Sequence, residues 1–222
     1  MLRALALLLV LLPIGAAAQS SLAEGFSKLP PGARIVLMPI DVELYELSSG
    51  GSLEPRADWT DAAAAYINKA LLGSSIGAGV KPMPGEMDSP VKKFIQLHRA
   101  VSSAVVIHHY GSLRLPTKRG LDWSLGAEAA WLADRADADY ALFLWVRDSY
   151  ASAVRKATIA VAAAVGLPVF GGAQQGYASL VELKSGRIVW FNRVSRMSGD
   201  LREESAAQET LDALLADFPA GP

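Results

Sequence analysis

The 222-residue chain contains no cysteine and almost no excess charge, with 21 basic against 22 acidic side chains. Without cysteine it has no disulfide scaffold, no thiolate metal site, no cysteine nucleophile and no lipid attached through an N-terminal cysteine. The formal charge of −1 excludes a polybasic nucleic-acid binder. Charged residues make up only 19% of the chain and hydrophobic residues 51%, which excludes a largely disordered protein. The length is sufficient for a real hydrophobic core in one domain or at most two.

The N-terminus has the pattern of a secretory signal peptide. Arg3 supplies the positive charge, residues 4–14 form the apolar segment, and the alanines at 16–18 form a cleavage site before Gln19. The apolar segment of about 11 residues is shorter than the roughly 20 that a membrane-spanning helix needs. We therefore expect residues 1–18 to be removed after Ala18 and the mature protein to be periplasmic.

After a short leader at 19–33, residues 34–218 read as one α/β domain. The pattern predicts a mixed sheet in two or three layers with flanking helices, a C-terminal β-hairpin and a final helix. Residues 140–146 are apolar on both faces, so we expect them to form the central strand. Proline at 39 predicts a bulge or an edge in the strand over 34–45. Asp58, Ser89, and Asp200 with Glu203 are expected to cap helices.

An apolar insertion at about 151–175 stands out, because residues 157–181 form a run of 25 without charge. Glycine and proline stop a helix near Val165, which leaves too few apolar residues to span a bilayer. The favoured interpretation is a buried helix or crossover over 153–165. The alternative is a surface that contacts a partner or a membrane, since large exposed apolar patches mark interaction sites. The candidate contact residues are Val161, Val165, Val169 and Phe170.

A hydrolase remains an alternative because residues 73–77 match the G-x-S-x-G pattern around Ser75. That motif requires a strand before the serine and a helix after it, whereas here a helix is expected before it. His98 or His108, with Asp88 or Asp122, would complete the catalytic set. The histidines do not show metal-ligand spacing, so we expect no metal and no cofactor.

Candidate binding residues follow the expected central strand. Arg147, Asp148 and Tyr150 would lie at its carboxyl end, where open α/β sheets bind ligands. The simpler alternative is that Arg147 pairs with Asp41 or Asp148 to satisfy the strand end. Trp123, in a polar loop, could anchor an interface or merely pack its loop onto the domain.

Three short motifs resemble one group of bacterial envelope proteins. They are Ile35-Val36-Leu37-Met38-Pro39-Ile40, Ala138-Asp139-Tyr140-Ala141-Leu142-Phe143, and the hairpin sequence over residues 181–190. The group includes the curli-secretion channel subunit, the lipoprotein activators of penicillin-binding proteins, and the N-terminal domain of the Tol-system periplasmic protein. The resemblance covers most of residues 34–218 and implies a non-catalytic module that binds other envelope proteins.

The sequence thus predicts a periplasmic protein-binding module in envelope assembly or maintenance, and not an enzyme. Its partner would be an envelope protein or a second copy of the chain, with peripheral contact to the outer membrane as a further mode and no nucleic acid. The alternatives are a hydrolase that uses Ser75 and a small-ligand binder at residues 147–150. Because no cysteine is available for lipidation, we expect the protein to be released and not tethered.

Overall fold

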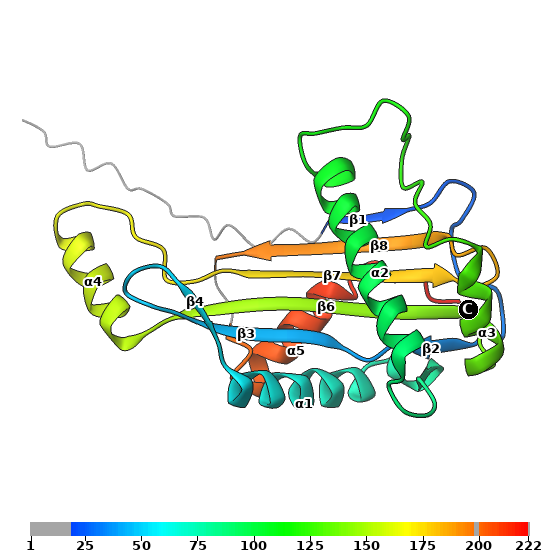
Figure 1. The fold of residues 1–222 in the computed structure, drawn as a ribbon, viewed down its shortest axis with the longest axis horizontal. Helices are drawn as coiled ribbons and strands as arrows, with labels where there is room; N and C mark the ends of the chain where they lie inside the picture. Colours follow the sequence, from blue (N-terminus) through cyan, green and yellow to red (C-terminus); the bar gives the residue numbers. More distant parts are fainter. Residues whose placement is uncertain (1–18, 198–199, 222) are drawn as a thin grey trace, which may run out of the picture.

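The computed structural model describes residues 19–197 and 200–221, which fold into one mixed β-sheet flanked by helices (Figure 1). The sheet has eight strands in the order β1-β8-β7-β6-β2-β5, and β3 and β4 extend it along the other half of β6. The predicted α/β class with a C-terminal hairpin and helix is confirmed. The signal peptide and its cleavage point lie outside the described residues.

The strands are β1 (Gln19–Leu22), β2 (Ile35–Leu37), β3 (Asp41–Leu47), β4 (Leu53–Pro55), β5 (Val80–Pro82), β6 (Tyr140–Ala151), β7 (Gln174–Glu182) and β8 (Ile188–Arg196). The α-helices are α1 (Ala57–Gly73), α2 (Ser89–Val105), α3 (Ala130–Ala136), α4 (Ala153–Ala164) and α5 (Glu204–Leu214). Short helical turns are η1 (Gly77–Gly79), η2 (Val106–Tyr110) and η3 (Ala127–Ala129), of which η2 is a π-helix that continues α2.

Strand β6 is the centre of the sheet, as its apolar sequence predicted. It pairs in parallel with β2 and β3 on one side and antiparallel with β7 on the other. Residues 34–45 do not form a single strand. The chain breaks at residues 38–40, where Pro39 cannot donate a backbone hydrogen bond, and β2 and β3 then pair with successive parts of β6.

Helices cover both faces of the sheet, which gives three layers. Helices α1 and α5 cover one face, where Leu44, Leu144 and Leu211 are fully or nearly fully buried. Helices α2 and α3 cover the other face over part of its length, and there Phe143 stacks on His98 with 3.9 Å between the ring centroids. Figure 1 shows that α2 crosses the sheet and leaves the part of this face toward α4 without a helix.

Two of the predicted helix caps are displaced in the structure, and the third lacks its side-chain hydrogen bond. The first helix begins after Arg56, and Asp58 lies inside its first turn, where it pairs with Arg56 at 2.8 Å. The cap of α2 is Asp88, whose carboxylate accepts a hydrogen bond from the Val91 amide, and not Ser89. At α5, Glu203 occupies the cap position without a capping side-chain bond. Acidic residues near helix starts are common for dipole reasons, so sequence alone misplaced the caps by one or two residues.

The segment expected to be a leader contributes to the sheet. Residues Gln19–Leu22 form edge strand β1, which pairs antiparallel with Trp190–Arg193 of β8. The Leu29 amide then donates a hydrogen bond to the carbonyl of Pro219, so the two ends of the described chain meet. None of the helices among the described residues has the length and hydrophobicity needed to cross a membrane.

Candidate functional site

The most prominent surface feature is an arm, residues 152–173, that is inserted between the antiparallel strands β6 and β7. It consists of α4 and the loop that returns to β7, and it extends from one end of the sheet (Figure 1). Ser152 begins the helix, because its hydroxyl accepts a hydrogen bond from the Arg155 amide. Gly166, with a φ of +75°, follows the helix end at a position that favours glycine.

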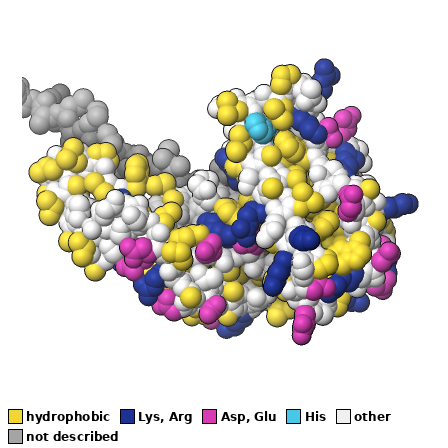
Figure 2. Space-filling view, in the orientation of Figure 1, with side chains coloured by type: hydrophobic (Ala, Val, Ile, Leu, Met, Phe, Trp, Pro, Cys, Tyr) yellow, Lys and Arg dark blue, Asp and Glu magenta, His cyan; other side chains and the backbone are white. Residues whose placement is uncertain are grey.

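The arm is exposed, so the favoured prediction of a buried helix is wrong. Helix α4 contains no buried residue, and Val161 is 70% exposed. Val165 and Phe170 are 69% and 65% exposed, while Val169 is half-buried. Figure 2 shows apolar side chains gathered over this end of the molecule. The apolar stretch was located correctly, but among the described residues nothing covers α4 well enough to bury any of its side chains.

The root of the arm is held by specific hydrogen bonds. Arg155 donates to the carbonyl of Phe170 at 3.0 Å and to that of Ser48 at 3.3 Å, in the turn after β3. The Ala151 amide donates to the carbonyl of Gly171 at 2.7 Å. Gly172 has a φ of +148°, and a Cβ there would lie 1.9 Å from the carbonyl oxygen of Ser149. The arm therefore has a fixed base, although its apolar side chains have no covering partner within the described residues.

The residues predicted at the end of the central strand lie inside it, because β6 continues to Ala151. Successive side chains of a strand point to opposite faces, so Arg147 faces away from Asp148 and Tyr150. The predicted group therefore divides into two separate clusters. The strand is longer than expected because β3 and β7 pair with its polar half.

Asp148 and Tyr150 form a buried polar cluster on the α5 side of the sheet. Asp148 is only 2% exposed and accepts hydrogen bonds from the Tyr150 hydroxyl, the Gln174 amide group and the Ser149 backbone. Burial raises the pKa of Asp148 to about 6, although these donors favour the charged form. Tyr150 also accepts from the Leu201 amide at 2.6 Å. The cluster ties the arm end of β6 and β7 to the segment before α5.

Arg147 lies on the open face of the sheet, and its partner is Asp41, as the simpler interpretation predicted. Its guanidinium contacts an Asp41 carboxylate oxygen at 2.7 Å and a Glu43 oxygen at 3.2 Å. Arg99 of α2 contacts the other oxygen of Asp41 at 2.6 Å. Two arginines and two carboxylates therefore balance each other in this cluster.

Trp123 lies at the opposite end of the sheet from the arm, next to the β7–β8 hairpin. Its carbonyl accepts a hydrogen bond from the Ile188 amide, and its ring stacks beside His108 with Lys118 over it. The side chain is half-buried, which fits a tryptophan that packs its loop onto the domain. The structure does not bring it together with Arg147 or the arm.

The residues of the hydrolase alternative have other partners. His98 is buried and its Nε2 contacts the hydroxyls of Ser179 at 2.6 Å and Ser102 at 3.1 Å, while burial lowers its pKa to about 3. His108 contacts the Leu113 carbonyl, Asp88 caps α2 and pairs with Arg135, and Asp122 pairs with Lys118. Ser75 lies in the loop between α1 and η1, without the strand that the motif needs. Among the described residues, no group of three or more His, Asp or Glu could hold a metal ion.

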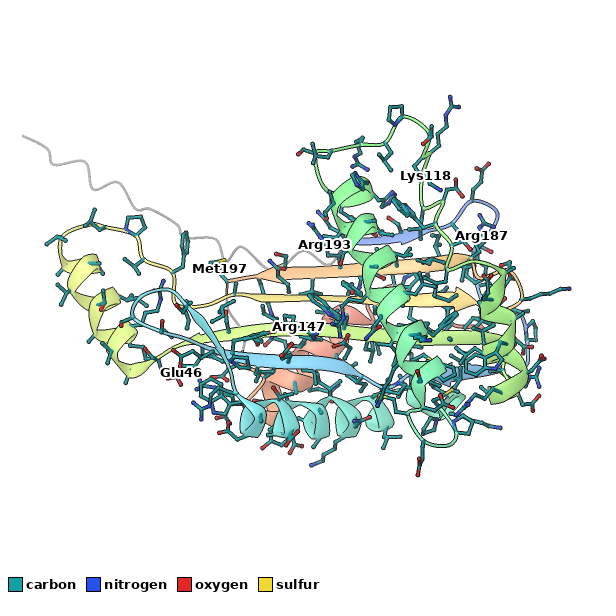
Figure 3. All side chains as sticks on the ribbon, viewed as in Figure 1. Glu46, Lys118, Arg147, Arg187, Arg193 and Met197 are labelled. Atoms are coloured by element: carbon teal, nitrogen blue, oxygen red, sulfur yellow. The ribbon has the colours of Figure 1, made fainter. Side chains whose placement is uncertain are left out.

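Sequence reasoning missed a groove on the open sheet face between the arm and α2. Figure 3 labels Arg147 and Arg193 in this region, and Figure 2 shows basic side chains there. The groove has a volume of about 200 Å³, and Trp145, Tyr177 and Arg193 are among its lining residues. Trp145 and Tyr177 read as core residues from their sequence, and only the pairing register of three strands places them beside Arg193.

No protein-family model and no curated protein matches the sequence. Solved structures that are similar include a PelC dodecamer from Paraburkholderia phytofirmans, at 15% identity over 93% of this chain and 100% of that one, with a TM-score of 0.42. Lipoprotein GNA1162 from Neisseria meningitidis is 15% identical over 73% of this chain and 81% of its own, with a TM-score of 0.29. The LpoB C-terminal domain from Salmonella enterica is 14% identical over 79% and 88%, with a TM-score of 0.30. The likeness is one of fold at low identity, and none of the three supplies a function for this chain.

Proposed function

We propose that this chain is an exported, non-catalytic module of the bacterial cell envelope that binds another envelope protein during envelope assembly or maintenance. The observation that carries the proposal is the arm, whose apolar side chains are exposed on a helix with a fixed base. Exposed apolar patches of this kind mark interaction surfaces, because leaving them in water costs free energy that a partner recovers. The signal-peptide pattern supports the periplasm as the compartment.

The arm is suited to contact because its conformation is largely formed in advance. The Arg155 bond to Phe170 connects the two ends of the arm, and its bond to Ser48 connects the arm to the turn between β3 and β4. A partner that covers Val161 and Phe170 would therefore gain apolar burial without ordering the base of the arm. An exposed aromatic side chain such as Phe170 is a typical interface anchor.

A second copy of the chain and the outer membrane are the other partners that the arm could contact. The hydrolase alternative has less support, since His98 and His108 each make contacts away from Ser75. Protein binding is therefore the proposed function, and a crosslinking experiment distinguishes an envelope protein from a second copy and from the membrane.

The test is photocrosslinking in intact cells with a photoreactive phenylalanine analogue at Val161 or Phe170. We expect each arm position to give a discrete adduct with one envelope protein. Leu72, which is 70% exposed at the end of α1, serves as the matched apolar control.

An adduct of twice the chain mass would identify a second copy, and crosslinks to lipid alone would identify a membrane contact. Either result, or equal labelling from Leu72 and the arm, would overturn the assignment of an envelope protein as the partner.

A further inference from the structure

The groove on the open sheet face is a second surface feature, separate from the arm. Its floor is formed by strands β6, β7 and β8, and one wall by the end of α2 and the π-helix η2, where Ile107 is 47% exposed. Ser195 and Gln175 lie at its exposed side. The volume of about 200 Å³ is below the range of about 300–1,000 Å³ typical of drug-sized ligands, so it suits a small molecule.

The floor carries a row of stacked side chains. Arg147 lies 4.8 Å over the Trp145 ring, Trp145 stacks on Tyr177 at 4.6 Å with 7° between the ring planes, and Tyr177 stacks on Phe191 at 5.5 Å. Neighbours in the row therefore occupy both faces of Trp145 and of Tyr177. A sugar ring that stacks flat on an aromatic face has no place here, because only ring edges are available to a ligand.

Two polar atoms of this floor lack a hydrogen-bond partner within the part of the chain that the structure describes. They are the indole nitrogen of Trp145 and the hydroxyl of Tyr177, a residue that is 3% exposed. Both atoms are shielded from solvent, so they belong to the packed floor and do not reach a ligand in the groove. Polar recognition in the groove therefore depends on Arg193, which is only half-buried.

Within the described ranges, the groove contains one cation, Arg193, and no carboxylate forms a salt bridge with it. Arg193 donates a hydrogen bond to the side-chain oxygen of Gln19 at 3.1 Å and lies over the Tyr110 ring, and neither neutralises it. No carboxylate is among the groove residues. Arg147 and Arg99, by contrast, are balanced by Asp41 and Glu43 next to the groove. A monoanion is therefore matched to the site, whereas a phosphate dianion would leave excess negative charge.

We propose that the groove binds a small monocarboxylate with an apolar body. The carboxylate would pair with the Arg193 guanidinium, whose fork of N–H donors fits two oxygens. The apolar body would lie against Val106 and Ile107 of the groove wall, above the edge of Trp145. The site is independent of the arm, none of whose residues lines the groove.

Calorimetric titration of the purified mature chain with 3-phenylpropanoate tests this proposal, with 3-phenylpropanamide as the uncharged match. We expect saturable binding of the acid and at least about tenfold weaker binding of the amide, because a charge-assisted pair contributes that much or more. Arg193→Met should weaken the acid at least about tenfold and leave the amide unchanged.

A second pair of variants distinguishes loss of the binding site from misfolding of the protein. Ile107→Asp places a like charge at the groove wall and should abolish binding of the acid, whereas Leu113→Asp, at a residue 66% exposed outside the groove, should not. Val161→Asp in the arm should also leave binding unchanged, which separates this result from the test of the proposed function. No saturable binding of the acid, equal binding of the amide, or full binding by Ile107→Asp would overturn the proposal.

Discussion

At the scale of single residues, Asp148 makes stability depend on pH. Its folded pKa of about 6 lies above the ordinary value of 3.8, because burial disfavours the charged form. A raised folded pKa means that the stabilising contribution is complete below about pH 4 and is lost as the pH rises through 6. We expect Asp148 to contribute about 1 kcal/mol more to the free energy of unfolding at pH 5 than at pH 8.

The substitution Asp148→Asn isolates this contribution, because an amide cannot titrate and can still accept from Tyr150 and Gln174. Urea unfolding should give a higher free energy of unfolding at pH 5 than at pH 8 for the wild type. In Asp148→Asn this contribution to the pH dependence should be absent. Asp212→Asn, on the outer face of α5, is the control. An Asp148→Asn protein with the wild-type pH dependence would contradict the raised pKa.

His98 should give the opposite pH dependence. Its pKa is lowered to about 3 by burial against Phe143, so only the unfolded chain takes up a proton between pH 6.5 and pH 3. The stability that the neutral ring contributes is present above about pH 6.5 and is lost on acidification, by about 2 kcal/mol at pH 5.

Replacement of His98 by Leu should remove this loss and also destabilise the protein at pH 7 by about 2 kcal/mol, because the Ser179 and Ser102 hydroxyls lose their partner in the core. Thermal unfolding at pH 5 measures the acid sensitivity, and thermal unfolding at pH 7 measures the destabilisation. His108→Leu, at a ring partnered by the Leu113 carbonyl near the surface, is the matched control. Unchanged acid sensitivity in His98→Leu would show that the ring is not the source.

At the scale of elements, the arm is an insertion that the rest of the fold does not need. Strands β6 and β7 pair as far as Asp148 and Gln174, and the arm joins their ends. We expect replacement of residues 154–170 by a short Gly-Ser turn to leave the free energy of unfolding within about 1 kcal/mol of the wild type, because no buried side chain is removed.

Chemical unfolding followed by tryptophan fluorescence provides the measurement, since residues 154–170 contain no tryptophan. Leu211→Ala in α5 provides the contrast, because that side chain is fully buried and its truncation should cost about 2–5 kcal/mol. A shortened chain that fails to fold would show that the arm is part of the core.

The same elements show what sequence patterns could and could not predict. The central strand, the hairpin and the apolar stripe of α5 follow from local periodicity, and all three are present. The burial of α4 depends on whether another element covers it, which no pattern within residues 153–165 encodes. The groove depends on the pairing of Trp145 with Tyr177 and of Tyr177 with Arg193, and these residues are 32 and 16 positions apart in sequence.

At the scale of the whole molecule, the predicted cleavage point lies directly before the described part of strand β1. Cleavage after Ala18 would leave Gln19–Leu22 paired with β8. Intact-mass measurement of protein from the periplasmic fraction should therefore give a chain that begins at Gln19, or its cyclised form. A chain cleaved beyond Leu22 would lack β1, and a full-length chain would contradict the signal peptide.

The meeting of the two chain ends has a consequence for the timing of folding. Ser20 contacts Asp217 and Leu29 contacts Pro219, so these contacts close only when residues 217–219 are available. Contacts between residues so distant in sequence form slowly, because the intervening chain must first lose its conformational freedom. A partly synthesised or partly translocated chain cannot make them. For an exported precursor, as proposed above, late closure of this kind would delay completion of the sheet edge until residues 217–219 have crossed the membrane.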